Sequence, residues 1–191
     1  QVAPPGLSRV FYADNGSTAV EIAAKIAFQY WQQNGAPERR VFLTLGGGYH
    51  GDTIGAMSLG GVDSFHRVFH PLMFSVARSP EARDAAAFEG AFAWIIEQLD
   101  ASPERIAGVF IEPLVLGAAG MRMYDPHLLR AVRDATNRHD TFLILDEVFT
   151  GFGRTGTMWA ADRAGVAPDL MCTAKGLTAG ALPFGAVLVT D

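Results

Sequence analysis

Two residues of the 191-residue chain have the type and surroundings that carbonyl chemistry needs. Asp146 follows the apolar run Thr141–Leu145, so its carboxylate is expected to be buried and to require a cationic or hydrogen-bonding partner. Lys175 lies among small residues in CTAKGLTAG, where lost solvation favours the neutral amine that attacks carbonyl groups. The alternatives are a metal ligand or strand-end cap for Asp146 and a solvent-facing loop for Lys175.

A helix start in NGSTAVE is the third candidate for a ligand site. Gly16, Ser17 and the free amides of Thr18 and Ala19 are predicted to open a helix, where the helix dipole and unpaired N–H groups favour a phosphate. Thr18 and Glu21 have the spacing of a capping box. The alternative is an ordinary helix cap without a ligand.

Two glycine motifs match the dinucleotide fingerprint G-x-G-x-x-G but lack its context. One is formed by Gly46, Gly48 and Gly51, and the other is GFGRTG (Gly151–Gly156). The fingerprint needs a long helix directly after the glycines and an acidic residue at the end of the next strand. Neither motif is followed by both, so a dinucleotide site is disfavoured.

A metal site and a serine-hydrolase site are also disfavoured. His66 and His70 have ligand spacing, but residue 67 is an arginine where the zinc motif H-E-x-x-H has glutamate. The chain has no G-x-S-x-G nucleophile elbow.

Apolar strands that alternate with amphipathic helices position these residues. Strands are predicted at Val41–Leu45, Ile106–Ile111, Thr141–Leu145, Leu170–Thr173 and Gly185–Thr190, and helices at Thr18–Asn34, His50–Leu59, Ala87–Leu99 and Pro126–His139. The residues from Glu112 to Asp125 are expected to form a long loop. This alternation predicts an α/β fold with a largely parallel sheet that is covered on both faces. Ligands bind at the carboxyl ends of such strands, so Tyr49, His50, Glu112, Asp146, Glu147 and Lys175 are expected to meet at one edge.

The bulk composition describes a globular protein without an evident nucleic-acid or membrane partner. The chain is 49% hydrophobic and 18% charged, and its net charge is −5. Its single cysteine, Cys172, rules out an intrachain disulfide and indicates a reducing, cytoplasmic location. The sequence does not start with methionine and stops after an apolar run, so both ends are expected to be cut from a longer protein.

One long stretch resembles a known family. LILDEVFTGFGRTG (Leu143–Gly156), followed by APDLMCTAKGLTAGALPFGAVLVT, is similar to the signature region of the class III aminotransferases that use pyridoxal 5′-phosphate (PLP). The interval between Asp146 and Lys175 fits this family as well. The resemblance covers essentially the whole chain. It implies fold type I, with residues 1–191 as the PLP-binding large domain and with the N-terminal segment and C-terminal small domain missing from this chain.

The resemblance gives the polar residues roles around PLP. It implies that Lys175 is the covalent anchor of the cofactor and later moves a proton, and that Asp146 pairs with the pyridine nitrogen. It places Glu112 and His50 near the cofactor.

The same resemblance implies how the ring and the phosphate are held. Val148 would pack on one face of the ring, and Tyr49 would stack on the other face and border the substrate. Gly16 and Ser17 would bind the phosphate. The glycines of Gly46–Gly51 would form a strand-end turn that lets the backbone approach a flat cofactor.

Within the family, three further stretches indicate a branch. FYADNGSTAVEIAAKIAFQYW, YHGDTIGAMSLGG and GAAGMRMYDP are most similar to the members that aminate 8-amino-7-oxononanoate in biotin synthesis, with adenosylmethionine or lysine as amine donor. The resemblance also implies a homodimer of the full-length protein. The alternatives are a family member acting on ω-amino acids, ornithine or 4-aminobutyrate, and an inactive fragment of such an enzyme.

Overall fold

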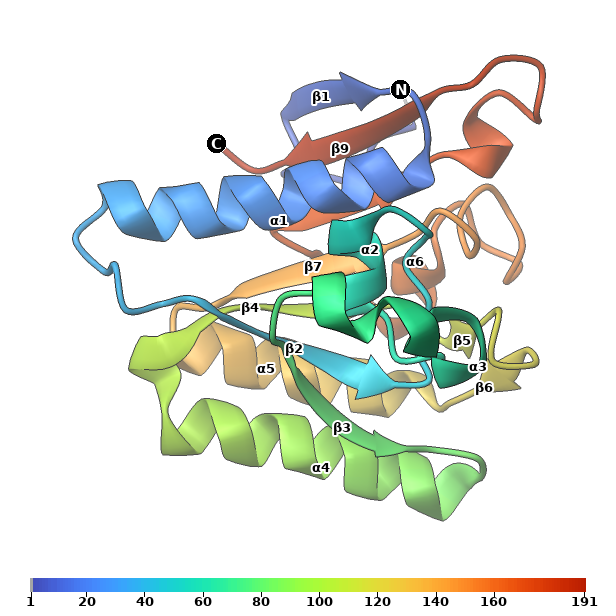
Figure 1. Cartoon of the computed structure of the whole chain (residues 1–191). Helices are drawn as coiled ribbons and strands as arrows, with labels where there is room; N and C mark the ends of the chain where they lie inside the picture. Colours follow the sequence, from blue (N-terminus) through green and yellow to red (C-terminus); the bar gives the residue numbers. More distant parts are fainter. Residues whose placement is uncertain (1) are drawn as a thin grey trace.

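The computed structural model describes residues 2–191 and is organised around a seven-stranded sheet (Figure 1). The strand order is β1-β9-β8-β7-β4-β2-β3, and the five strands from β8 to β3 run parallel. Strand β9 is antiparallel to β8, and β1 is antiparallel to β9. The predicted α/β fold is thus confirmed. The bounds are β1 (Arg9–Ala13), β2 (Val41–Gly46), β3 (Ala77–Glu81), β4 (Ile106–Ile111), β7 (Phe142–Asp146), β8 (Leu170–Thr173) and β9 (Gly185–Val189).

Helices cover both faces of this sheet, as Figure 1 shows for α1 on one side and α4 and α5 on the other. The alternation of side chains along the strands explains the two layers. In β7, Leu143 and Leu145 pack with the cluster that contains Phe92 of α4, whereas Ile144 packs with Val20 of α1. The helices are α1 (Gly16–Gln33), α2 (Ile54–Leu59), α3 (Asp63–His66), α4 (Ala85–Ala101), α5 (Pro126–Arg138) and α6 (Ala160–Ala164), with 3-10 turns at Arg67–Leu72, Pro103–Arg105 and Lys175–Leu177.

The start of α1 corrects two sequence-based expectations. Asn15, not Thr18, caps the helix: its Oδ1 accepts from Thr18 N at 2.9 Å, and its carbonyl accepts from Ala19 N at 3.1 Å. The amides of Thr18 and Ala19 are therefore not free for a ligand. Glu21 does not close a capping box either, because its Oε1 accepts from Gly55 N at 2.7 Å and so ties α1 to α2.

The elements that the sequence did not predict are short, and the two edge strands among them bury few residues. Edge strand β1 buries only its last residue, and edge strand β3 buries only Ser79. The expected loop after Glu112 contains a hairpin of β5 (Val115–Leu116) and β6 (Arg122–Met123). Helix α2 begins at Ile54 rather than at His50, which leaves His50 in the turn after β2.

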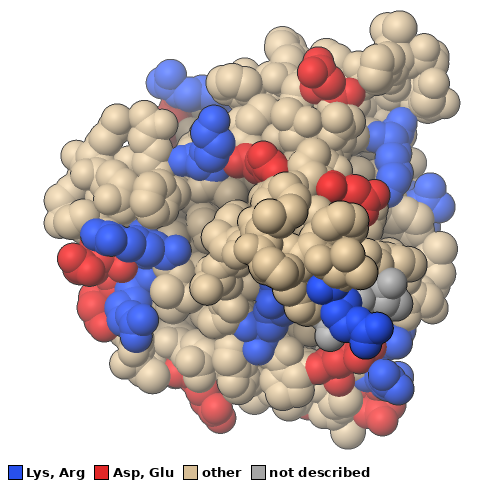
Figure 2. Space-filling model, viewed as in Figure 1, with Lys and Arg blue, Asp and Glu red and all other residues tan. Residues whose placement is uncertain are grey.

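The surface agrees with the mixed composition. Among residues 2–191, no helix has both the length and the apolar character needed to cross a bilayer. Acidic and basic side chains are interspersed on the face shown in Figure 2.

Candidate active site

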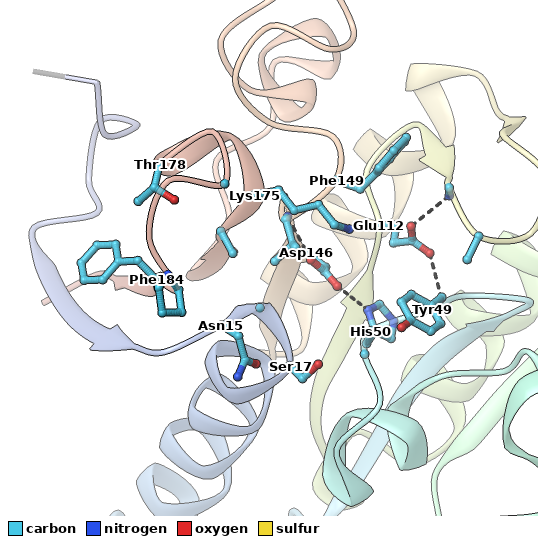
Figure 3. Close-up of a pocket in the computed structure, with 18 of the residues that line it drawn as sticks. Asn15, Ser17, Tyr49, His50, Glu112, Asp146, Phe149, Lys175, Thr178 and Phe184 are labelled. Carbon is cyan, nitrogen blue, oxygen red and sulfur yellow. Dashed lines mark hydrogen bonds and ion pairs between the residues drawn. The ribbon is translucent and has the colours of Figure 1, made fainter.

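A cavity of about 600 Å³ opens at the carboxyl ends of β2, β4, β7 and β8, beside the start of α1 (Figure 3). Eight of the residues predicted from the sequence line it, namely Gly16, Ser17, Tyr49, His50, Glu112, Asp146, Val148 and Lys175. These residues come from segments far apart in the chain, and the parallel sheet brings them together because its strands end at the same edge.

Asp146 and His50 form a buried pair at the floor of the cavity, and each is only 4% exposed. His50 Nδ1 lies 2.8 Å from Asp146 Oδ2, and Asp146 Oδ1 accepts from Val148 N at 3.0 Å. Burial lowers the pKa of His50, but the hydrogen bond to Asp146 and its charge outweigh burial, so the pKa is raised overall. The contact with His50 and the bond from Val148 N together fix the position of the Asp146 carboxylate.

Glu112 connects the turn after β2 to the β5–β6 hairpin. Its Oε1 accepts from Tyr49 N at 2.8 Å and its Oε2 accepts from Gly117 N at 3.0 Å, as the dashed lines in Figure 3 show. Burial raises the pKa of Glu112 to about 7. Glu112 lines the cavity as predicted, but both of its carboxylate oxygens are bonded to backbone amides of the chain.

Tyr49 and Ser17 are linked through Asp52, which the sequence did not single out. Tyr49 OH donates to Asp52 Oδ2 at 2.8 Å, and Asp52 N donates to Ser17 Oγ at 3.2 Å. His66, considered only as a metal ligand from its spacing, lies with Nε2 3.3 Å from Asp52 Oδ1, and its ring stacks on Tyr49 at 5.8 Å between centroids. Burial and Asp52 raise the pKa of Tyr49 to about 12, so its hydroxyl stays neutral.

The glycines around Tyr49 make room for protein atoms. A Cβ on Gly46 would lie 2.5 Å from the carbonyl oxygen of Ser79, so the glycine lets β2 and β3 approach closely. Gly51 has a φ of +125°, and a Cβ there would lie 2.0 Å from Ser17 Oγ. The close approaches at these two glycines are to β3 and to Ser17, and Gly51 also lines the cavity.

Substituting Gly51 by alanine is expected to displace the Ser17 hydroxyl and to strain the turn, because the new methyl overlaps Ser17 and L residues rarely adopt this φ. We expect a loss of stability of about 1–3 kcal/mol and at least a tenfold weaker binding of phosphate-bearing ligands. Thermal melts and ligand titrations measure both. The matched control is Gly90→Ala in α4, where a Cβ meets nothing within 4 Å, and which should raise stability by about 0.5–1 kcal/mol.

Lys175 follows β8 at the opening of a 3-10 turn, Lys175–Leu177. Its φ of +25° is unusual for a residue with a side chain, and such backbone strain gathers at functional sites. Its Nζ lies 5.5 Å from the ring centroid of Phe149, which the sequence analysis did not single out. Figure 3 shows Phe149 and Lys175 on the same side of the cavity. The position of Phe149, three residues after Asp146 at a strand end, is the signal that identifies it in hindsight.

Glu147, the neighbour of Asp146, is an exception to the expected meeting of polar residues, because it is fully buried and does not line the cavity. Its Oε1 accepts from Ala161 N at 2.9 Å at the start of α6, and its Oε2 accepts from the hydroxyl of Thr150. Burial raises the pKa of Glu147 to about 7. Glu147 therefore fixes the segment after β7 to α6.

The raised pKa of Glu147 predicts a pH-dependent stability. The folded state keeps the proton up to about pH 7, whereas the unfolded chain releases it near 4.5, so the free energy of unfolding falls as pH rises between these values. Glu147→Gln removes this contribution. Between pH 5 and 7.5, its stability should fall by about 2 kcal/mol less than that of the wild type. Urea unfolding at the two pH values measures it. The exposed control Glu104→Gln should leave the pH dependence unchanged, and a Glu147→Gln profile that matches the wild type would contradict the assignment.

Comparisons with known proteins agree with this geometry. The family model described as aminotransferase class III matches residues 1–191. The chain is 46% identical to the adenosylmethionine-8-amino-7-oxononanoate aminotransferase of Geobacter sulfurreducens, over 100% of this chain and 44% of that protein.

Solved structures give the same result. The crystal structure of the adenosylmethionine-8-amino-7-oxononanoate aminotransferase from Methanocaldococcus jannaschii superposes with a TM-score of 0.90 at 39% identity, covering 100% of this chain and 43% of the other. An amine transaminase from an uncultivated Pseudomonas species, solved in its PLP-bound form, gives a TM-score of 0.88 at 37% identity, over 96% of this chain and 44% of the other.

This chain thus spans less than half the length of these relatives. The family model matches it from end to end, and the structural neighbours share its sheet and flanking helices. The chain belongs to the class III aminotransferase family.

Proposed function

We propose that this chain is the cofactor-binding part of a PLP-dependent aminotransferase that transfers an amino group to 8-amino-7-oxononanoate. The observation that carries the proposal is the meeting of Asp146, Lys175 and the start of α1 in one cavity. The 46% identity to a relative with this named activity supports the choice of acceptor.

The residues of the cavity fit PLP by their chemistry. The start of α1 at Gly16 and Ser17 suits a phosphate, since amides at a helix start have no partner within the helix. The Asp146 carboxylate suits a protonated ring nitrogen, and the Lys175 amine suits an aldehyde. The cavity volume of about 600 Å³ lies within the range of small-molecule sites.

PLP supplies an electron sink that stabilises negative charge on the amine-bearing carbon of the substrate. Lys175 Nζ would hold the cofactor and, once released by the substrate amine, would take the proton from that carbon and return it. The Asp146 carboxylate would accept from a protonated ring nitrogen, and His50, whose Nδ1 lies 2.8 Å from Asp146 Oδ2, would hold that carboxylate in place. Tyr49 and Val148, which both line the cavity, would bound the ring.

The net exchange conserves the amino group. The donor amine leaves as a carbonyl compound, and the ketone of 8-amino-7-oxononanoate becomes an amine to give 7,8-diaminononanoate. Adenosylmethionine is the donor that the names of the relatives support, and lysine is the alternative.

We further propose that the full-length protein is a homodimer. Phe65, Val68 and Leu72, at α3 and the adjoining 3-10 turn, are 54%, 83% and 65% exposed, which supports a protein partner over this segment. Sedimentation of the full-length protein is expected to give twice the monomer mass, and a monomer at micromolar concentration would exclude this assembly.

The test of function uses the full-length protein reconstituted with PLP. We expect a visible or near-ultraviolet absorbance band that adenosylmethionine or lysine bleaches and that 8-amino-7-oxononanoate then restores. Bleaching by 4-aminobutyrate or ornithine alone would exclude the proposed acceptor and assign another activity within the family. The absence of any band in the wild type would exclude PLP chemistry.

A further inference from the structure

The turn GFGRTG (Gly151–Gly156) has no part in the site described above. All six of its residues are described by the structure, and none lines the cavity. We propose that Phe152 in this turn is a positioning residue that acts through Gly176 to hold the backbone of Lys175 in place. The inference rests on the proposed role of Lys175.

The first observation is a close contact between Phe152 and the residue next to Lys175. A Cβ built on Gly176 would lie 2.6 Å from Phe152 Cδ2 and 2.8 Å from Phe152 Cβ. Gly176 is not among the residues with positive φ, so its backbone conformation is open to alanine. Glycine is therefore required at position 176 for space, because Phe152 packs directly against the backbone there.

The second observation is that Phe152 is itself held firmly. Its φ is +60°, a conformation that a bulky residue adopts only when its surroundings impose it. Its ring packs edge-on against Trp159, with centroids 4.9 Å apart. Trp159 is only 3% exposed, and its Nε1 donates to the carbonyl of Val2 at 2.8 Å. Phe152 therefore has a rigid support behind it.

The third observation is that Lys175 depends on its surroundings for its conformation. Its φ is +25°, and the turn is tight, because Leu177 N donates to the carbonyl of Ala174 at 2.6 Å. A residue in this conformation relaxes unless neighbouring atoms prevent it. Phe152 supplies such atoms at the next residue along the chain.

The same turn also contacts Phe149, whose ring lies near the Lys175 amine. Arg154 Nε donates to the carbonyl of Phe149 at 2.7 Å, and its guanidinium lies 4.3 Å from the Phe149 ring centroid. The Lys175 Nζ lies 5.5 Å from the centroid of the same ring. The GFGRTG turn thus packs against the backbone next to Lys175 through Phe152 and against Phe149 through Arg154. The contact of Phe152 is the one that a substitution can test.

The experiment exchanges side chains across this contact in the full-length protein with PLP. Gly176→Ala creates the overlap, Phe152→Gly removes the ring, and the double variant Phe152→Gly with Gly176→Ala places a methyl group in the vacated space. Glycine at position 152 also suits the positive φ. The matched control is Phe142→Ala, a partly buried phenylalanine of β7 that packs on Tyr30 and Trp31, away from the cavity.

For Gly176→Ala we expect kcat to fall on the order of tenfold with KM within about twofold, because a small displacement of a reacting group is costly. The pH midpoint of the PLP absorbance band should shift by about one unit. The double variant should recover at least half of the kcat loss and of the shift. Phe142→Ala should lower the melting temperature without moving the band.

Two results would overturn the inference. The first is a Gly176→Ala variant whose kcat and absorbance midpoint equal those of the wild type. The second is a double variant whose kcat and midpoint are no closer to the wild type than those of Gly176→Ala. If Gly176→Ala does not accumulate as folded protein, Phe152→Leu tests the same contact, and an unshifted midpoint there refutes it. If the wild-type protein with PLP shows no absorbance band, the proposed function itself is excluded, which is a separate outcome from these two.

Discussion

Lys175→Ala is expected to lose the PLP absorbance band and to lower kcat at least about 10⁴-fold, because in the proposed function one amine would be both covalent anchor and proton carrier. The structure supports this double role with the position of Lys175 at the end of β8, on the wall of the cavity that also contains Asp146.

The second lysine of the chain provides the control. Lys25 lies on α1 and does not line this cavity, and the printed sequence contains no other lysine. Lys25→Ala should keep the band and kcat. Reduction of the PLP-loaded protein with borohydride, followed by peptide mapping, should find the cofactor on Lys175 and not on Lys25. Recovery of the label on Lys25, or a persisting band in Lys175→Ala, would refute the assignment.

Asp146→Asn is expected to keep the band and to lower kcat about 10³-fold. The neutral amide has one oxygen in place of the two that accept from Val148 N and contact His50 Nδ1, and it has no charge to hold a protonated ring nitrogen. The Lys175 amine is unaffected, so the covalent link to PLP should still form. Absorbance spectra and single-turnover half-reactions separate these two effects.

The exposed Asp140 after α5 serves as the control for Asp146, because asparagine tolerates its positive φ of +47°. Asp140→Asn should leave both band and kcat unchanged. A single-turnover rate within threefold of the wild type in Asp146→Asn would show that Asp146 does not support the ring nitrogen.

The centre of the fold could be predicted because its strands are fully buried. Residues Ile106–Ile111 and Leu170–Thr173 bury every side chain, so they form continuous apolar runs with the bounds that the structure confirms. The rule that parallel strands end at one edge then predicted the meeting of Glu112, Asp146 and Lys175. Edge strand β3 has no such run, and the apolar run of edge strand β1 is exposed except for its last residue. Each is held in the sheet by pairing with a single neighbour, β9 for β1 and β2 for β3.

The supports of the site could not be predicted, because they depend on contacts between distant segments. The capping role of Asn15 is local, and the sequence DNGS contains its signal. The bond from Asp52 N to Ser17 Oγ and the contact of Phe152 with Gly176 join residues whose proximity only the folded chain establishes. Periodicity carries no information about such pairs.

The two hydrogen bonds that Glu112 accepts connect two segments of the cavity wall. The two oxygens of this carboxylate accept from Tyr49 N and from Gly117 N. A shift of one segment therefore strains the hydrogen bond to the other. Changes in the β5–β6 hairpin, whose loop is Gly117–Met121, are therefore expected to move the ring of Tyr49. A design that replaces this hairpin to accept a new amine is therefore expected to displace Tyr49. The hairpin and the turn that carries Tyr49 need to be redesigned together.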